Sequence, residues 1–263
     1  MLELIGYILA IFVGISIGLI GAGGSILALP ILVYLFGVEA AETAPAYSLF
    51  IVAACSLVGS YMKNKQELIN FKLVWSFGIP TVIAIFVTRY FVVPAIPDDV
   101  FSIGQFMVTK RLLVMGLFAV LMIFASFYMM RQKISEESVK VNAIFNFGGG
   151  FATGFLSGFV GSGGGFMIIP ALIKVGHIGV KVAVATSMVI IAINTSVGFA
   201  ASVSHVTIDW TLLFTFSGLA VLGIFIGNSL SKKVNPNHLK KGFGWFILIT
   251  GIFILINELI IKH

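Results

Sequence analysis

Two clusters of glycines have the residue types and the spacing that could bind a ligand. Gly21-Ala-Gly23-Gly24-Ser25 is named here the first glycine break, and Gly161-Ser162-Gly163-Gly164-Gly165 the second. Neighbouring glycines are unfavourable in a continuous helix, at about 1 kcal/mol each relative to alanine. A helix that stops there and restarts presents unpaired backbone N–H groups, which attract anions. The clusters therefore predict two anion-binding helix starts, the first of them capped by Ser25.

Polar side chains that follow each break could add hydrogen bonds to such an anion. The predicted binding residues outside the breaks are Tyr47, Ser48, Thr186, Ser187 and Asn194. Ser56 and Thr195 are further hydroxyl groups nearby, at matched positions of the two halves of the chain. The alternative for a serine or threonine in a membrane helix is a hydrogen bond to a carbonyl of its own preceding turn.

The composition indicates that a membrane positions these residues. Of the 263 residues, 59% are hydrophobic and 10% are charged, and the mean hydropathy is +1.11. Soluble domains carry about 25% charged residues. A soluble enzyme and a nucleic-acid-binding protein are therefore excluded, and we predict a multi-pass, all-α integral membrane protein.

Eight apolar stretches are long enough to cross a bilayer, which takes about 20 residues per helix. They are 2–36, 43–62, 71–93, 111–130, 141–173, 180–204, 208–230 and 242–261. The first and the fifth contain the glycine breaks, so each is predicted to enter the membrane, turn at its break and return as a hairpin. The polar segment 93–110 predicts a turn-rich surface connection.

The two halves of the chain form a tandem repeat. At an offset of 140, Gly14, Gly18, Gly21, Gly23, Gly24 and Pro30 coincide with Gly154, Gly158, Gly161, Gly163, Gly164 and Pro170. The repeat predicts two membrane units, 1–133 and 134–263. The pairs Gly14/Gly18 and Gly154/Gly158 have GxxxG spacing and are assigned to helix packing rather than to binding.

The basic residues indicate how the repeats are oriented. If both long stretches are hairpins, the loops 63–72, 131–140, 174–181 and 232–241 share one side and hold twelve of the 16 Lys and Arg residues. Single crossings would split the 16 into 9 and 7. The positive-inside rule therefore favours hairpins, with those loops in the cytoplasm. Each half then crosses an odd number of times, so the repeats are inverted, as in many secondary transporters.

Charged residues are sparse in the spans, and this limits the substrate. Arg89, Lys174 and Lys181 lie near span ends and are expected to reach the membrane interface. A hydrogen bond to a charged group returns only about 1.5–3 kcal/mol. Half a dozen backbone donors cannot balance a dry dianion, so the site is predicted to stay open to water on one side or to hold a small anion of low charge.

Catalytic patterns are missing from the sequence. It has no Ser/His/Asp set, no HExxH motif and no paired carboxylates within a span. The single Cys55 excludes an intrachain disulfide and a multi-cysteine metal site. We therefore predict no enzymatic activity, no catalytic residue, no metal and no cofactor.

The two halves share a more specific pattern. In each, a G-x-G-G cluster stands six residues before a proline and leads to an A-x-A-[TY]-S segment, 44–48 or 183–187. In this duplicated pattern the chain resembles the sulfite exporter TauE/SafE family over nearly its whole length. The resemblance implies an inner-membrane permease for small anions, often sulfur oxyanions or organosulfonates, that generally exports them. Pro45 and Tyr47 stand where the second half has Val184 and Thr186, so the two halves of a site would be chemically unequal.

The predicted function is secondary transport, by alternating access, of a small anion bound between the two breaks. The expected partners are that anion and the lipid bilayer, with no nucleic acid. A coupling proton or sodium ion and a homo-oligomer are left open. Two alternatives remain from the sequence: a channel or carrier for another small solute, and a membrane scaffold subunit that transports nothing.

Overall fold

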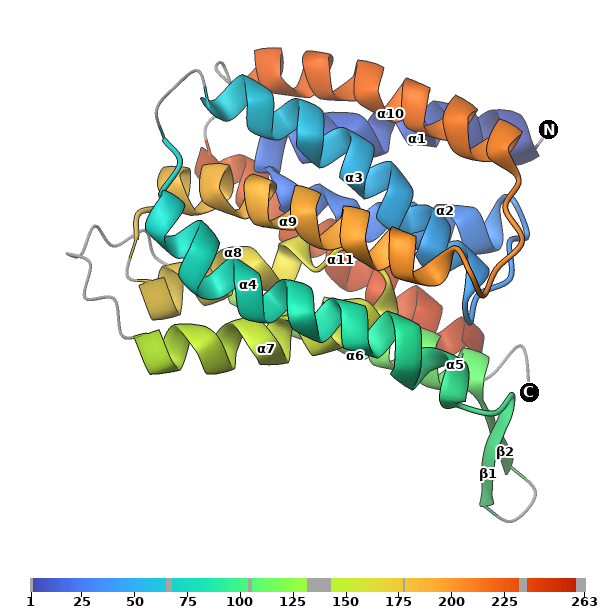
Figure 1. Ribbon diagram of the computed structural model, residues 1–263. Coiled ribbons are helices and arrows are strands. Elements are labelled where there is room, and N and C mark those ends of the chain that lie inside the picture. The colour runs from blue at the N-terminus through green and yellow to red at the C-terminus, as the bar shows by residue number, and fades with distance from the viewer. Residues whose placement is uncertain are drawn as a thin grey trace.

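The protein is a bundle of helices that lie side by side (Figure 1). The computed structural model describes residues 2–64, 68–103, 106–131, 143–176, 178–231 and 236–258. The elements of the first half are α1 (Leu2–Ile20), η1 (Ala22–Leu27), α2 (Ala28–Tyr34), α3 (Thr43–Asn64), α4 (Phe71–Val87), η2 (Thr88–Val92), α5 (Val93–Ala95), β1 (Asp99–Ile103), β2 (Phe106–Thr109) and α6 (Lys110–Arg131). Those of the second half are α7 (Ala143–Val160), α8 (Gly165–Gly176), α9 (Val180–Ser202), α10 (Trp210–Ser231) and α11 (Pro236–Ile256).

Membrane-spanning character is strong in both halves. Among the described residues, five helical segments are long and apolar enough to cross a bilayer: Thr43–Lys63, Phe71–Ala95, Lys110–Phe127, Val182–Ser202 and Trp210–Ser231. Shorter apolar helices cover Glu3–Leu19, Ser25–Tyr34 and Gly244–Ile256. Many large apolar side chains, Trp75 and Phe124 among them, are exposed on the outside of the bundle, where lipid would cover them. The predicted class, a helical multi-pass membrane protein, is confirmed.

Both glycine breaks interrupt a helix and turn the chain back. The chain runs along α1, changes direction at Gly21 and returns through η1 and α2. In the second half it runs along α7, turns at 161–164 and returns as α8. The two hairpins enter the bundle from opposite ends (Figure 1).

The glycine pairs with GxxxG spacing are packing residues, as predicted. A Cβ at position 14 would strike the backbone carbonyl of Ala220 on α10, and one at position 18 would lie 2.7 Å from the carbonyl oxygen of Ile224. In the second half, a Cβ on Gly154 would lie 2.8 Å from Cα of Thr81 on α4. In both helix pairs, α1 with α10 and α7 with α4, glycines therefore allow the two backbones to approach closely.

The middle of the bundle joins the two halves directly. Helix α3 packs along α9, and α6 packs along α11. Ser126 of α6 donates a hydrogen bond to the carbonyl of Gly244 on α11 at 2.7 Å. The largest core cluster contains the fully buried rings of Phe118 and Phe216, one from each half. The two halves thus share one hydrophobic core.

The ends of the helices group by position. The ends of α3, α6, α8 and α10 and the starts of α4, α7, α9 and α11 lie at the left of Figure 1. The link between α2 and α3, the link between α9 and α10, and the start of α6 lie at the right.

The connection before α6 differs from the predicted run of turns. Its strands β1 and β2 pair antiparallel, with Phe101 opposite Val108 and Ile103 opposite Phe106. Aromatic and β-branched residues favour strands, so this short segment forms a hairpin despite its prolines and aspartates. In the described ranges the elements are therefore helical except for this β-hairpin.

Some of the sequence predictions concern residues outside the described ranges. The boundary at 133/134 between the predicted units lies there. So do several basic residues of the predicted cytoplasmic loops: Lys65, Lys133, Lys140, Lys232 and Lys233.

Candidate functional site

The backbone at the two breaks takes a conformation that favours glycine. Gly21 has φ 80°, and Gly161, Gly163 and Gly164 have φ 73°, 73° and 67°. This left-handed region strains residues that carry a Cβ. The prediction that the glycines break the helix is confirmed. The predicted cap is wrong, because η1 begins at Ala22 and no side-chain hydrogen bond caps it, while Ser25 is buried inside η1.

Each break rests on a helix of the other half. A Cβ on Gly21 would strike Val184 of α9, and a Cβ on Gly161 would strike Pro45 of α3. Between them, η1 packs against α8. The two breaks therefore meet at the interface of the halves, with the starts of α3 and α9 beside them.

The second break also contacts α3 and α9 further along. A Cβ on Gly163 would lie 2.7 Å from Cγ2 of Thr195 and 2.9 Å from Cγ1 of Val52. Residues 45, 48 and 52 share one face of α3 because they are three and four residues apart. Since Pro45 and Val52 both contact the second break, Ser48 lies on the face that meets it.

Several buried polar atoms of the predicted site and of the helices packed beside the breaks have no hydrogen-bond partner among the described residues. At the predicted site they are Oγ of Ser48, Oγ of Ser162, and both Oδ1 and Nδ2 of Asn194. Oγ of Ser56 and Oγ of Ser157 share this property, and Ser157 faces the position of a Cβ on Gly164. Leaving such a group buried and unpaired costs about 1–3 kcal/mol. A concentration of these groups indicates either a site that a ligand completes or a place that water enters.

Other predicted binding residues already have partners within the protein. The hydroxyl of Tyr47 donates to the carbonyl of Thr207 at 3.3 Å and accepts from the amide of Asp209, which ties α3 to the link before α10. Oγ1 of Thr186 accepts from the amide of Asn70 at 3.0 Å. Ser187 donates to the carbonyl of Val184 at 2.9 Å, the local alternative considered for membrane hydroxyls. In the described conformation these three side chains stabilise the fold.

Arg89 overturns one expectation. It was predicted to reach the membrane interface, but it is 2% exposed. Within the described part of the chain neither its Nε nor its Nη2 has a hydrogen-bond partner, and Nη2 lies where a Cβ on Gly161 would stand. The physical reason is that Gly161 has no side chain, so the guanidinium packs against the second break inside the protein. A π-helical turn, η2, and the short α5 prolong α4 to Ala95, so Arg89 lies inside the segment Phe71–Ala95. The side chains of Lys174 and Lys181 are not among those that the structure describes, so for these two residues the interface location stays a prediction.

An ion pair lies beside this arginine. Nζ of Lys110, 4% exposed, contacts Oε1 of Glu42 at the start of α6. Glu42 is also the carboxylate whose charge acts on Arg89. Glu42 therefore pairs with Lys110, although its charge also acts on Arg89. Among the described residues no acid forms a direct ion pair with Arg89.

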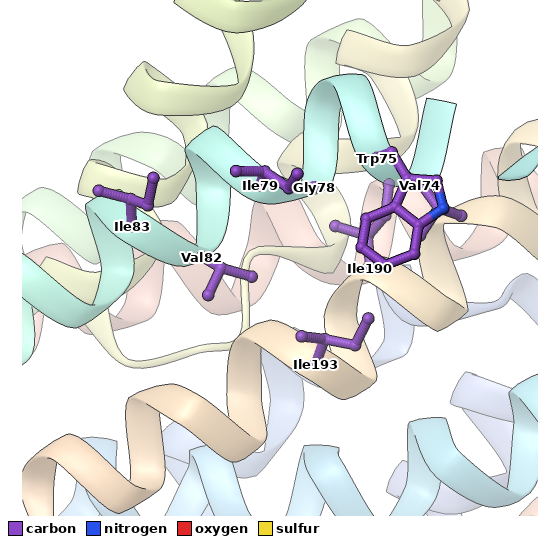
Figure 2. A pocket seen from close by; sticks show the side chains of 8 residues that line it. All are labelled: Val74, Trp75, Gly78, Ile79, Val82, Ile83, Ile190 and Ile193. Carbon is purple, nitrogen blue, oxygen red and sulfur yellow. The ribbon is translucent and has the colours of Figure 1, made fainter. Parts of the chain in front are cut away.

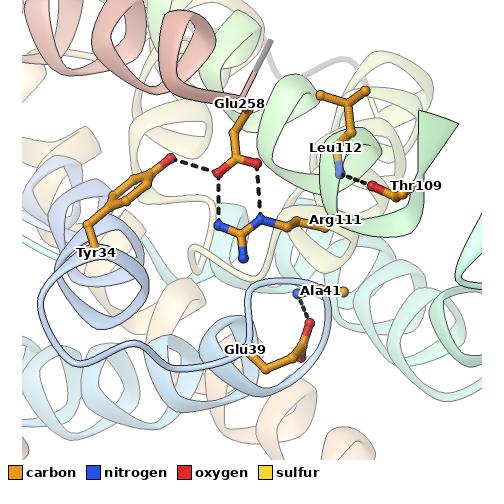
Figure 3. A network of polar contacts seen from close by, with 7 residues as sticks. All are labelled: Tyr34, Glu39, Ala41, Thr109, Arg111, Leu112 and Glu258. Atoms are coloured by element: carbon orange, nitrogen blue, oxygen red, sulfur yellow. Dashed lines mark hydrogen bonds and ion pairs between the residues drawn. The ribbon is translucent and has the colours of Figure 1, made fainter. Parts of the chain in front are cut away.

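A second network of polar contacts lies at the same end of the bundle (Figure 3). Arg111 donates from Nε to Oε2 of Glu258 at 3.0 Å and from Nη2 to Oε1 at 2.9 Å. Tyr34 donates to Oε1 at 3.0 Å. The network links the end of α2, the start of α6 and the end of α11, and it lies apart from the breaks.

The groove in Figure 2 has a different character. It measures about 220 Å³ and lies between α4 and α9. Its lining residues are Val74, Trp75, Gly78, Ile79, Val82, Ile83, Ile190 and Ile193. Hydrocarbon side chains give an anion no hydrogen bonds, so this groove is not a candidate for the predicted site. Nor do three His, Cys, Asp or Glu residues of the described ranges come together as metal ligands.

The comparison with protein families is decisive. The model of the family "Sulfite exporter TauE/SafE" matches residues 7–254. The chain belongs to this family. The resemblance inferred from the duplicated glycine–proline pattern is thereby confirmed, and the family and its relatives are membrane transporters, not enzymes.

The relatives of this TauE/SafE protein span distant organisms. A protein of Methanocaldococcus jannaschii named "Probable membrane transporter protein" is 27% identical over 275 residues, which cover 97% of this chain and 95% of that protein. One of Xylella fastidiosa strain 9a5c with the same description is 28% identical over 265 residues, 92% of this chain and 91% of the relative. YunE of Bacillus subtilis, a "Probable membrane transporter protein", is 35% identical over 104 residues, 40% of this chain and 37% of its own length. No solved structure matches the chain.

Proposed function

We propose that this membrane transporter is a secondary carrier for a small anion, a sulfur oxyanion or an organosulfonate, which binds where the two glycine breaks meet. The observation that carries the proposal is the set of unpaired polar groups there. Among the described residues the hydroxyls of Ser48 and Ser162 are buried without partners at backbone that only glycine favours, and the amide of Asn194 is buried without partners on α9, which packs against α8. Hydrogen bonds from these hydroxyls and from Nδ2 of Asn194 to an anion are worth about 1.5–3 kcal/mol each, so substrate binding would satisfy these donors.

Backbone amides would supply the rest of the site. Helix α8 has 12 residues and begins at Gly165, directly after the second break. The amides of Met167 and Ile168 already donate to the carbonyl of Gly164, so those of Gly165 and Phe166 would supply the donors. The positive end of the helix also attracts anions. The family name, sulfite exporter, agrees with a sulfur oxyanion.

Alternating access would follow from inverted repeats, 1–133 and 134–263. The contacts of one half recur in the other: Gly21 meets Val184 and Gly161 meets Pro45, at the offsets found in the sequence. The hairpins also enter from opposite ends of the bundle. Rocking of one half against the other would expose the breaks to each side in turn. The left end in Figure 1 would face the cytoplasm, since twelve of the 16 basic residues belong to its loops.

The test is a thermal-shift screen of the purified protein with sulfite, sulfate, thiosulfate and small sulfonates or carboxylates, followed by counterflow in proteoliposomes. A carrier shows counterflow, whereas a channel does not. Gly163→Val should abolish flux, because its side chain would meet Val52 and Thr195. Gly37→Ala is the matched control, since Gly37 also has positive φ, 65°, but nothing stands within 4 Å of its Cβ position. Normal flux in Gly163→Val would remove the break from the site.

A further inference from the structure

We propose that Arg89 is the residue that binds the substrate's charge, and that the substrate is a monovalent oxyanion held chiefly by the second break where the two breaks meet. The inference rests on the transport function proposed above and assigns its site. It would also explain why a membrane helix keeps a buried arginine that forms no ion pair with any described residue. Ionisable groups at such depth usually mark a substrate pathway.

The geometry brings three kinds of hydrogen-bond donor together. Nη2 of Arg89 faces Gly161, whose missing side chain leaves room for the guanidinium. The next residue, Ser162, has a buried hydroxyl without a partner. Three residues later α8 begins; the amides of Met167 and Ile168 donate to the carbonyl of Gly164, so those of Gly165 and Phe166 would face the ligand. Guanidinium, hydroxyl and helix start therefore surround the second break.

The atoms of Arg89 that lack partners are the ones that grip an oxyanion. Nε and Nη2 form one edge of the guanidinium, and their N–H bonds are nearly parallel. Arg111 shows the use of this edge in the same protein, because its Nε and Nη2 hold the two carboxylate oxygens of Glu258. Arg89 has the same edge buried and without a partner, so a sulfonate or another oxyanion could accept both bonds.

Charge balance indicates one negative charge on the substrate. Arg89 and Lys110 are cations, and Glu42 is the carboxylate that pairs with Lys110. These three residues together carry one net positive charge. A monovalent anion beside Arg89 would neutralise it, whereas a dianion would leave a negative charge in a region of low dielectric constant.

The first break has no equivalent of this arginine. At the offset of 139, Asn228 stands where the first half has Arg89. The first break is followed by a six-residue 3-10 helix and the seven-residue α2, so it offers a weaker helix start than α8. The site is thus one-sided, although the fold is repeated.

Arg89 also connects the two halves. It lies on the α4–η2 helix of the first half, which packs along α7 of the second, and it reaches the break at the end of α7. The π-helical turn at Thr88–Val92 shifts the helical register at this point, and such turns are frequent at functional sites. An anion bound here would join donors from both halves, and movement between the halves would separate those donors.

The experiment uses the purified full-length protein with methanesulfonate, a monovalent probe, and sulfate, a divalent one. Thermal shift gives the affinity of each, and counterflow in proteoliposomes gives transport. The variants are Arg89→Gln, Arg89→Lys and, as the control at the repeat-related position, Asn228→Gln.

We expect the wild type to bind methanesulfonate more tightly than sulfate. Arg89→Gln should weaken binding about ten- to a hundredfold, the equivalent of the lost hydrogen bonds to a charge. Arg89→Lys should weaken it about tenfold, since lysine keeps the charge without the paired edge.

The outcomes separate this inference from the transport function. Wild-type affinity for methanesulfonate in Arg89→Gln, or equal losses in Asn228→Gln, would overturn the role of Arg89 while leaving anion transport in place. Tighter binding of sulfate by the wild type would overturn the monovalent assignment. If Arg89→Gln cannot be purified, wild-type affinity in Arg89→Lys overturns the proposed grip. If no anion of the full screen shifts or crosses with the wild type, the proposed transport function itself fails.

Discussion

Arg111 and Glu258 join the start of α6 to the end of α11 through two parallel hydrogen bonds of 3.0 and 2.9 Å. One residue belongs to the first half of the chain and the other to the second. Glu258 is 2% exposed and Arg111 is 32% exposed, so the carboxylate is the buried partner. Tyr34, from the end of α2, donates to the same carboxylate. The pair therefore fastens three elements at the end of the bundle opposite the predicted cytoplasmic loops.

Removal of Arg111 alone should be more harmful than removal of both partners. Arg111→Leu leaves a buried carboxylate without its cation, which costs about 3 kcal/mol in comparable pairs. The partial exposure of Arg111 lowers that cost. The double variant Arg111→Leu/Glu258→Leu removes the charge as well and should unfold nearer the wild-type temperature in detergent. If the double variant were less stable than Arg111→Leu, the pair would contribute more stability than the neutralisation of the Glu258 charge alone.

The glycines of α7 offer a paired test of helix packing. A Cβ on Gly154 would lie 2.8 Å from Cα of Thr81 and 3.0 Å from Cβ of Ala84, whereas nothing stands within 4 Å of a Cβ on Gly148. Gly154→Ala should separate α7 from α4 and destabilise the protein by about 1–3 kcal/mol. Gly148→Ala lies in the same helix and should be neutral or slightly stabilising. Unfolding midpoints in detergent compare the two, and equal values would contradict the packing role.

Glycine spacing and composition were sufficient to predict the helical membrane class, the two broken stretches and the packing of Gly154. Each of these depends on local backbone requirements, which the sequence expresses directly. The burial of Arg89 was not predictable in the same way. The apolar stretch ends near residue 93 in the sequence, whereas the burial of Arg89 depends on Gly161, a distant residue whose missing side chain leaves room for the guanidinium. An arginine four residues from the apparent end of a span can lie either at the membrane interface or inside the protein.

The polar side chains show a similar limit. Ser48, Ser162 and Asn194 are buried without partners among the described residues, whereas Tyr47, Thr186 and Ser187 are engaged within the protein. All six were equal candidates in the sequence. Their difference depends on which backbone group lies opposite in the fold, such as the amide of Asn70 for Thr186. Such pairings between distant segments cannot be derived from spacing.

Glu39 should make the stability of the protein depend on pH. Partial burial raises the pKa of its carboxyl, but hydrogen bonds from the amides of Thr43, Glu42 and Ala41 outweigh this, and the net pKa is lowered from 4.5. A lowered pKa in the folded state means that the ionised group adds stability above its ordinary pKa. This contribution is lost as pH falls through the lowered value.

The variant Glu39→Gln checks this assignment. The side chain is exposed, so we expect a loss of only about 0.5 kcal/mol at neutral pH. The difference from wild type should vanish in acid, where Glu39 is protonated in both the folded and the unfolded state. Unfolding curves in detergent at neutral pH and at several acidic values measure it. A difference that persists unchanged below the lowered pKa would contradict an electrostatic origin.

Asn194 allows stability and transport to be separated. Its amide oxygen and nitrogen are buried without partners, so the protein without substrate bears their desolvation cost. Asn194→Leu has a similar volume and removes both polar atoms, which can be neutral or stabilising by about 1 kcal/mol. If Asn194 binds the anion, the variant should unfold at an equal or higher temperature without substrate, while its substrate-induced thermal shift and its counterflow decrease.

The control Thr195→Val removes a hydroxyl that already bonds to the carbonyl of Ile191 at 2.6 Å, and it should keep both the substrate-induced thermal shift and the counterflow. A stable Asn194→Leu protein with wild-type counterflow would remove Asn194 from the site, because an amide that binds substrate cannot be replaced by hydrocarbon without loss of affinity.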